Sequence, residues 1–425
     1  MDVPVWQRLI SLLGLFSMVG IAWLLSAQRD RVSWRIVGWG VGLQLMFGVL
    51  VMKTRAGLWV FSVLNDLVLA LLGFTAQGTE FIFGAFASEK FTIAINVLPT
   101  LIFFSALMTM LYHLGLMQRL VSGFAWIMRR TMKTSGSETL ATAANAFVGQ
   151  TEAPLMVAPF IKGMTRSELA AVMTGGFATV AGGVLAAYVG LLDRVVPNIA
   201  GHLIAASVMS APAALVIAKV MWPETEESET ADGARVEVER PDVNLVDAAA
   251  RGATEGMKLA LNVGAMLIAF IALIALGNAL LGLPFELYNE WMGLEGAAAI
   301  EPWTLQKLLG WIFWPFAFLI GVPAAECGVI GTLLGEKLVL TEFIAYLHLY
   351  ESLADGITQL SPRTVVIASY ALCGFANFGS IGIQLGGIGG IAPERRHDLA
   401  RLGVQAMFGG MLASLMTASV AGLLY

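Results

Sequence analysis

Long apolar runs alternate with short charged segments along almost the whole chain. An α-helix needs about 20 apolar residues to cross the hydrocarbon core of a bilayer. The first run is followed by a charged stretch, Gln28–Arg31, and not by a small-residue cleavage pattern, so we expect a spanning helix there and not a signal peptide. The pattern predicts spanning helices at about 9–25, 36–52, 91–118, 169–192, 197–221, 257–284, 364–393 and 402–425.

Three apolar segments do not fit a simple crossing. Residues 134–165 and 302–350 are interrupted by glycine, proline or charged residues. Residues 57–85 contain Asn65 and Asp66 and carry aromatic side chains of the kind found at membrane interfaces. We therefore expect an interfacial helix within 57–90 and two irregular, hairpin-like segments.

Composition supports a membrane protein. Hydrophobic residues make up 57% of the 425 residues and charged residues 13%, about half the charged fraction of soluble domains. Mean hydropathy is +0.77, which excludes a disordered chain, a coiled coil and an ordinary cytosolic enzyme. Cys327 and Cys373 both lie in apolar surroundings, so neither a disulfide framework nor a thiolate metal site is indicated.

The charges are unevenly placed. Residues 223–243 hold eight acidic and two basic side chains, so this segment accounts for the net charge of −5 and the remainder is nearly neutral. We interpret it as a solvated connector, and no basic patch suggests a nucleic acid partner.

Positive charge favours the cytoplasmic side of a membrane. With the N-terminus outside, 17 of the 25 Lys and Arg residues fall on the cytoplasmic side, so both termini are predicted to be periplasmic. In this topology Lys53 and Arg55 fall on the periplasmic side, against the rule.

The two interrupted segments resemble each other. The first contains Thr151-Glu152 and is followed by Gly-Phe-Ala-Thr at 176–179, and the second contains Thr341-Glu342 and is followed by Gly-Phe-Ala-Asn at 374–377. Paired, interrupted segments that enter from opposite faces are typical of inverted-repeat transporters with a midplane site. We predict an all-α polytopic membrane protein with about eight transmembrane helices, two re-entrant helical hairpins in inverted repeat, and an interfacial helix.

The carboxylates in these segments are the main candidates for function, because a charge at bilayer depth is costly unless it faces water or a partner. Gly149 and Pro154 flank Glu152, so the helix must break beside it and expose backbone groups that can bind ions or polar substrates. The alternative is an ion pair with Lys162 that holds the loop.

Glu342 has a corresponding alternative, an ion pair with Lys337. Asn377 and Ser380, in the longest uncharged run, could serve only as polar contacts between helices.

Three motifs in this order resemble the concentrative nucleoside transporter family. Residues 149–155 (GQTEAPL) match that family's GQTEAPL element, residues 335–346 resemble its G-x-K-x3-N-E-F-V-A-Y signature, and residues 373–382 resemble its CGFANFSSIG run. The similarity extends from about residue 90 to the end. Thr341 stands where the family has Asn, Gly379 where it has Ser, and Gly183 where Ser is common.

The resemblance implies a homotrimer that imports nucleosides together with Na⁺ or H⁺ across the bacterial inner membrane, with eight crossings and two hairpins in each protomer. Na⁺ is the expected coupling ion, H⁺ is the alternative, and no organic cofactor is expected. The substrate-binding residues carried over by motif are Gln150, Thr151, Glu152, Val184, Glu342, Phe375, Asn377 and Ser380. The cation-binding residues carried over are Asn145, Val148, Thr179 and Val180.

A membrane-embedded enzyme is the competing class. The chain contains neither H-E-x-x-H nor a G-x-S-x-G nucleophile elbow, and its four histidines are scattered without metal-ligand spacing. We therefore expect a transporter in which a hairpin-bearing unit moves against the remainder. The predicted divisions are 1–56 (first spans), 57–90 (interfacial helix), 91–133 (third span and connector), 134–193 (first hairpin and following span), 194–301 (two spans with the acidic loop 223–250), 302–393 (second hairpin and following span) and 394–425 (last span).

Overall fold

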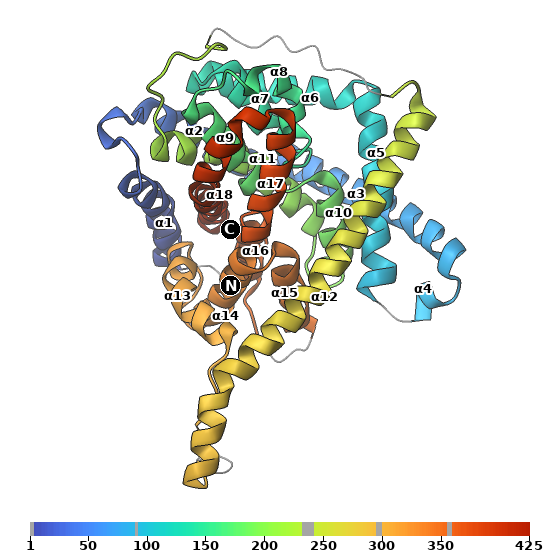
Figure 1. The fold of residues 1–425 in the computed structure, drawn as a ribbon, viewed down its shortest axis with the longest axis vertical. Helices are drawn as coiled ribbons and strands as arrows, with labels where there is room; N and C mark the ends of the chain where they lie inside the picture. The colour runs from blue at the N-terminus through green and yellow to red at the C-terminus, as the bar shows by residue number, and fades with distance from the viewer. Residues whose placement is uncertain (1–3, 90–91, 232–241, 295–299, 355–358) are drawn as a thin grey trace.

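A computed structural model of the chain describes residues 4–89, 92–231, 242–294, 300–354 and 359–425. Within these residues the regular secondary structure is entirely helical (Figure 1). The all-helical fold predicted from the apolar runs is thereby confirmed. Part of the acidic segment, residues 232–241, lies outside the described residues.

The helices fall into an N-terminal group and two matching series. The N-terminal group is α1 (Val5–Leu24), α2 (Trp34–Lys53), α3 (Arg55–Phe83) and α4 (Phe86–Glu89). The first series is α5 (Leu98–His113), α6 (Leu116–Met132), α7 (Gly136–Asn145), α8 (Ala158–Ile161), α9 (Arg166–Ala178), α10 (Gly182–Leu192) and α11 (Ile199–Met221). The second is α12 (Leu245–Met292), α13 (Leu305–Leu319), α14 (Cys327–Val339), α15 (Glu342–Ala354), α16 (Pro362–Leu372), α17 (Phe378–Ile391) and α18 (Arg396–Leu424).

The two series correspond element by element. In each, two helices are followed by a broken pair, an interrupted helix and an unbroken helix. Corresponding members pack together, α5 along α12 and α11 along α18. The first broken pair, α7 and α8, lies at the upper end of the molecule in Figure 1, whereas α14 and α15 lie toward the lower end. This arrangement supports the inverted repeat inferred from the motifs.

Burial separates a central group of helices from a peripheral one. The helices α9, α10, α11 and α18 are mostly buried, whereas α3 and α12 are mostly exposed. α12 has 48 residues and is therefore about 72 Å long, at about 1.5 Å per residue. That is more than twice the thickness of a hydrocarbon core, and its far end projects from the body in Figure 1.

Eight helices of the described chain are long and apolar enough to cross a membrane, although they are not the predicted eight. They include α3, for which we predicted an interfacial position, and its placement on or across the bilayer stays a prediction. They exclude the expected span at 364–393, because the chain there forms two helices, α16 and α17. A continuous helix was predicted because uncharged sequence alone does not reveal a break.

The two ends of the chain lie together. An Arg8 guanidinium nitrogen (Nη2) donates a hydrogen bond to the backbone oxygen of Tyr425, 3.4 Å away. The helices α1 and α18 also pack against each other. The first described residues and the C-terminus therefore lie on the same side of the molecule, and the side of the membrane that they face stays a prediction.

Candidate functional site

The first predicted hairpin breaks where Gly149 and Pro154 indicate. α7 begins with a capping-box sequence, in which the Glu138 carboxylate accepts from the backbone N–H of Ser135 at 2.8 Å, and it ends at Asn145. A turn then leads into a short 3-10 helix, Ala153–Val157, that contains Pro154. The predicted site residues Gln150, Thr151 and Glu152 lie in this turn.

The second hairpin breaks at its Thr-Glu pair. α14 ends at Val339 and α15 begins at Glu342, so only two residues separate the helices. The hydroxyl oxygen of Thr341 accepts a hydrogen bond from the backbone N–H of Ile344 at 3.4 Å. Thr341 thus takes part in starting α15 and places Glu342 at its N-terminus.

The repeated Gly-Phe-Ala motif marks two further breaks, which the sequence analysis treated as parts of continuous spans. Thr179, with extended backbone (φ −122°, ψ 170°), ends α9. Gly374 has φ +142°, a conformation that L side chains rarely adopt. A Cβ atom on Gly374 would lie 2.9 Å from the carbonyl oxygens of Phe177 and Ala178. The two breaks therefore touch, and only glycine permits that approach.

Glu342 is buried beside these breaks and has two neutral hydrogen-bond donors. Tyr188 donates its hydroxyl proton to Glu342 Oε1 at 2.7 Å. Asn377 donates from Nδ2 to Glu342 Oε2 at 2.8 Å. Lys337, the partner in the alternative interpretation, instead donates to the backbone oxygen of Ala371 at 2.9 Å. Neutral donors thus hold the carboxylate, and each carboxylate oxygen keeps a lone pair for a further hydrogen bond.

The hydrogen bonds continue from Asn377 to the first hairpin. Asn377 Oδ1 accepts from the backbone N–H of Ser380 at 2.8 Å and caps α17. Gln150 donates from Nε2 to the Ser380 hydroxyl oxygen at 3.3 Å. Gln384 donates from Nε2 to Gln150 Oε1 at 3.0 Å and to the Met173 carbonyl at 3.1 Å. A continuous polar network therefore joins the two hairpins, which are far apart in sequence.

Two members of this network, Tyr188 and Gln384, were missed by the sequence analysis. Tyr188 lies four residues after Val184, and Gln384 lies four after Ser380, so each shares a helix face with a predicted site residue. Polar groups at that spacing in an otherwise apolar run were the available signal. Tyr188 is fully buried, and its ring lies 4.5 Å from that of Tyr346, measured between centroids.

The other predicted substrate residues occupy different surroundings. Val184 and Phe375 are buried, and Thr151 is half-buried against Gly387 of α17. Glu152 is exposed, so the two acidic side chains are not buried together. The Lys162 ammonium pairs with the Glu394 carboxylate at 3.5 Å. The structure therefore gives no support to the alternative in which a Glu152–Lys162 ion pair holds the hairpin turn.

The predicted cation residues come from two adjoining breaks. The backbone N–H of Gly182, just after Thr179 and Val180, donates to the Phe147 carbonyl at 3.2 Å and joins the hairpin turn to the α9–α10 break. Asn145 is fully buried, and neither atom of its amide group has a hydrogen-bond partner in the described part of the chain. An unpartnered buried amide is free to take a ligand, and amide oxygen suits a hard cation.

Val148 and Val180 are buried on the same two segments. The Thr179 hydroxyl donates to the Gly175 carbonyl at 2.8 Å.

Family models match most of the chain. Residues 13–86 match the Na⁺ dependent nucleoside transporter N-terminus, residues 94–195 match a nucleoside recognition gate, and residues 202–422 match the Na⁺ dependent nucleoside transporter C-terminus. An uncharacterized transporter of Haemophilus influenzae is 44% identical, and the match covers 98% of this chain and 97% of that protein. Sodium/nucleoside cotransporter 1 of Mus musculus is 41% identical, over 99% of this chain and 64% of that protein.

Solved structures of the transporter CNTnw have the same fold. An inward-facing, substrate-bound structure superposes with a TM-score of 0.89 at 42% identity and covers 98% of both chains. An outward-facing structure gives a TM-score of 0.90, also at 42% identity, over 99% of this chain and 98% of that one. With family models across most of its length and relatives above 40% identity, the chain belongs to the concentrative, Na⁺ dependent nucleoside transporter family and is a transporter, not an enzyme.

Proposed function

We propose that this protein is a secondary active symporter that takes up nucleosides across the bacterial inner membrane, driven by the Na⁺ gradient. The observation that carries the proposal is the buried network that runs from Tyr188 through Glu342 and Asn377 to Gln150 and Gln384. It joins a carboxylate, which accepts hydrogen bonds from sugar hydroxyls, to an amide, which can both donate and accept at a base edge.

Each end of the network retains capacity for a substrate. Both oxygens of Glu342 already accept one hydrogen bond, and each has a further lone pair for a ribose hydroxyl. Gln150 uses one N–H and one lone pair internally and keeps one of each. Asn377 and Ser380 lie between the two groups, and Val184 and Phe375 supply apolar surface for a flat base. We place Thr151 and Glu152, in the same turn, at the nucleobase.

The unpartnered Asn145 amide supports a Na⁺ site formed with Thr179 and with the backbone of Val148 and Val180. Because this segment continues directly into Gln150, an ion bound there would order the turn that contacts the base. Na⁺ and nucleoside would then strengthen each other's binding reciprocally.

The arrangement of the helices supports an elevator-like alternating access. The broken pairs lie toward opposite ends of the molecule (Figure 1). The interrupted helices that follow them touch at their breaks and pack against the central helices α11 and α18. The peripheral α12 packs along α5 and leaves most of its apolar surface exposed. We propose that the central unit, which bears the two hairpins, moves against α5 and α12. These two helices would face other copies of the chain in a homotrimer. The adjoining termini would be periplasmic.

The test is an uptake panel in proteoliposomes with labelled uridine, cytidine, adenosine and guanosine. Each is measured with an inward Na⁺ gradient and with choline replacing Na⁺ at fixed pH. We expect accumulation of at least one nucleoside against its gradient only with Na⁺. Uptake that persists in choline and follows a pH gradient would show H⁺ coupling instead, and no accumulation under either gradient would refute symport.

Replacing Glu342 with Gln tests the site itself. The variant should lose uptake while remaining folded, because Gln presents an N–H donor where the sugar hydroxyl needs an acceptor. Glu286→Gln, an exposed position on α12, is the matched control and should transport normally. Normal uridine transport by Glu342→Gln would refute the assignment of Glu342 to the sugar.

A further inference from the structure

An open groove separates α1 from α2, far in sequence from the proposed transport site. Both helices pack against α11 and α18, and between them they leave a hollow of about 370 Å³. Its lining is apolar and includes two glycines that keep it open. The lining residues are Phe16, Val19, Gly20 and Trp23 from α1, and Trp34, Val37 and Gly38 from α2.

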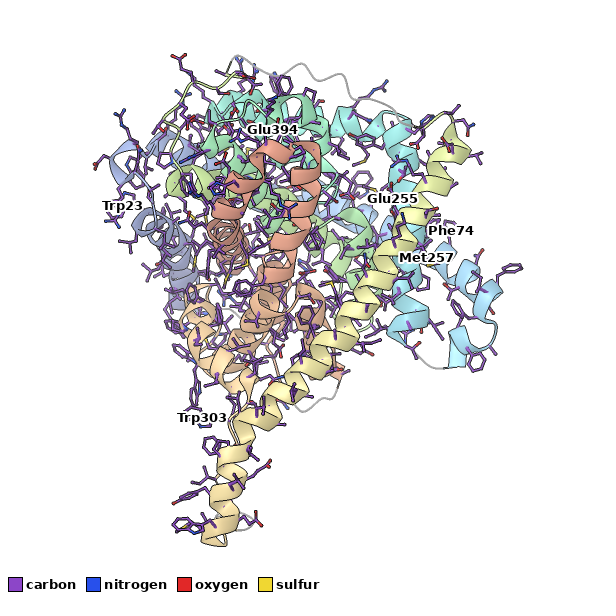
Figure 2. All side chains as sticks on the ribbon, viewed as in Figure 1. Trp23, Phe74, Glu255, Met257, Trp303 and Glu394 are labelled. Carbon is purple, nitrogen blue, oxygen red and sulfur yellow. The ribbon has the colours of Figure 1, made fainter. Side chains whose placement is uncertain are left out.

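This groove has open space and exposed aromatic walls. A Cβ atom on Gly20 or Gly38 would meet no other atom within 4 Å. Trp34 is 60% exposed, and Trp23 lies at the outer edge of the molecule in Figure 2. In a membrane protein, an exposed apolar groove between spanning helices is filled by hydrocarbon, and tryptophans concentrate at the level of the headgroups.

A polar hollow adjoins the groove at the loop between the two helices. It measures about 620 Å³ and is lined by residues 26–31. The loop is anchored to the body, because the backbone N–H of Ala27 donates to the Met221 carbonyl at 2.9 Å. Ser26 is one of the lining residues, and its hydroxyl oxygen is buried with no hydrogen-bond partner among the residues that the structure describes.

The charge around this loop is positive and lacks counter-ions. Arg29, Arg31 and Arg35 are exposed, and Asp30 is the one acid among them in the sequence. In the described part of the chain none of these four side chains forms an ion pair. The Arg29 guanidinium lies 5.5 Å from the centre of the Trp23 ring, which places positive charge directly at the apolar groove.

We propose that this α1–α2 corner, meaning the groove residues together with Arg29, Arg31 and Arg35, binds an anionic glycerophospholipid. One acyl chain lies in the groove and the arginines bind the phosphate. Arginine suits phosphate because its planar group donates two parallel hydrogen bonds. The net charge favours an anionic headgroup over a zwitterionic one, which brings its own cation. The adjoining groove favours a lipid over a free phosphate. Basic pockets between spanning helices on the cytoplasmic side are a known way to bind anionic lipid.

The experiment uses delipidated, full-length protein and native mass spectrometry. Phosphatidylglycerol and phosphatidylcholine with identical acyl chains are the two probes, and glycerol 3-phosphate is a competitor at equal concentration. We expect the wild-type protein to retain phosphatidylglycerol preferentially and glycerol 3-phosphate not to displace it. Arg31→Gln and Arg35→Gln should each lower its retention about fivefold, the effect of about one surface charge. Arg401→Gln, also exposed, should not.

The groove is tested separately by filling it. Gly38→Leu should lower the retention of both lipids, whereas Gly73→Leu, also with open space around its Cβ atom, should not. Equal retention of the two lipids by the wild-type protein would overturn the proposal, as would unchanged retention in the arginine variants. Displacement by glycerol 3-phosphate would also overturn it, because the ligand would then be a soluble phosphate.

Discussion

The hydroxyl group of Tyr188 offers a sharp test of how the buried carboxylate is held. Tyr188→Phe removes one oxygen atom and with it the 2.7 Å hydrogen bond to Glu342 Oε1. The aromatic ring stays, so its contacts with Tyr346 and Phe343 are retained. A hydrogen bond to a charged group contributes about 1.5–3 kcal/mol. If that energy orients Glu342 for the sugar, KM for uridine should rise about 10- to 100-fold, at about 1.4 kcal/mol per factor of ten.

Tyr346→Phe is the matched control for this substitution. Tyr346 is also fully buried, but its hydroxyl donates to the Ser369 carbonyl at 2.7 Å and not to Glu342. Initial rates of labelled uridine uptake in proteoliposomes give KM for both variants, and thermal unfolding in detergent reports their stability. A role in positioning requires a raised KM in Tyr188→Phe alone. Equal KM values in the two variants would refute the reasoning, because the lost hydroxyl would then matter only for packing.

Three further substitutions probe the cation site, the contacting breaks and the hairpin turn. Asn145→Leu removes the unpartnered amide and should make uridine uptake equal in Na⁺ and in choline. The control is Asn65→Leu, which removes a buried amide on α3 and should leave the Na⁺ dependence of uptake intact. Gly374→Ala should destabilise the fold by at least about 1–3 kcal/mol, seen as a lower unfolding temperature, because a Cβ atom there meets strained backbone and two carbonyl oxygens. Glu152→Gln should abolish uptake in a folded protein, measured with labelled uridine, because it replaces one carboxylate oxygen, a proposed acceptor at the nucleobase, with an N–H donor.

Each of these has an outcome that contradicts it. Preserved Na⁺ dependence in Asn145→Leu would move the ion elsewhere. Equal unfolding temperatures for Gly374→Ala and for Gly382→Ala, whose Cβ atom would meet no other atom within 4 Å, would show that the two breaks do not need close contact. Normal uridine rates in Glu152→Gln would remove that residue from the site.

The sequence by itself determined the fold class and the positions of the hairpin breaks. Apolar runs specify spanning helices because burial in lipid depends on local composition. Gly149, Pro154 and the Thr341-Glu342 pair indicated interruptions because their effect on a helix is local. The motifs at 149–155 and 373–382 likewise identified the family without any coordinates.

Only the tertiary structure decided which residues meet. The hydrogen bonds of Gln150 with Ser380 and Gln384 join residues more than 200 positions apart, and nothing local in the sequence specifies such a pairing. The breaks at Thr179 and Gly374 were hidden for a related reason. An uncharged run has the same hydropathy whether it is one helix or two. The interruption is stable because the two breaks pack against each other and freed backbone groups find partners in other segments, the Cys373 carbonyl with the Ser414 hydroxyl and the Gly182 N–H with the Phe147 carbonyl.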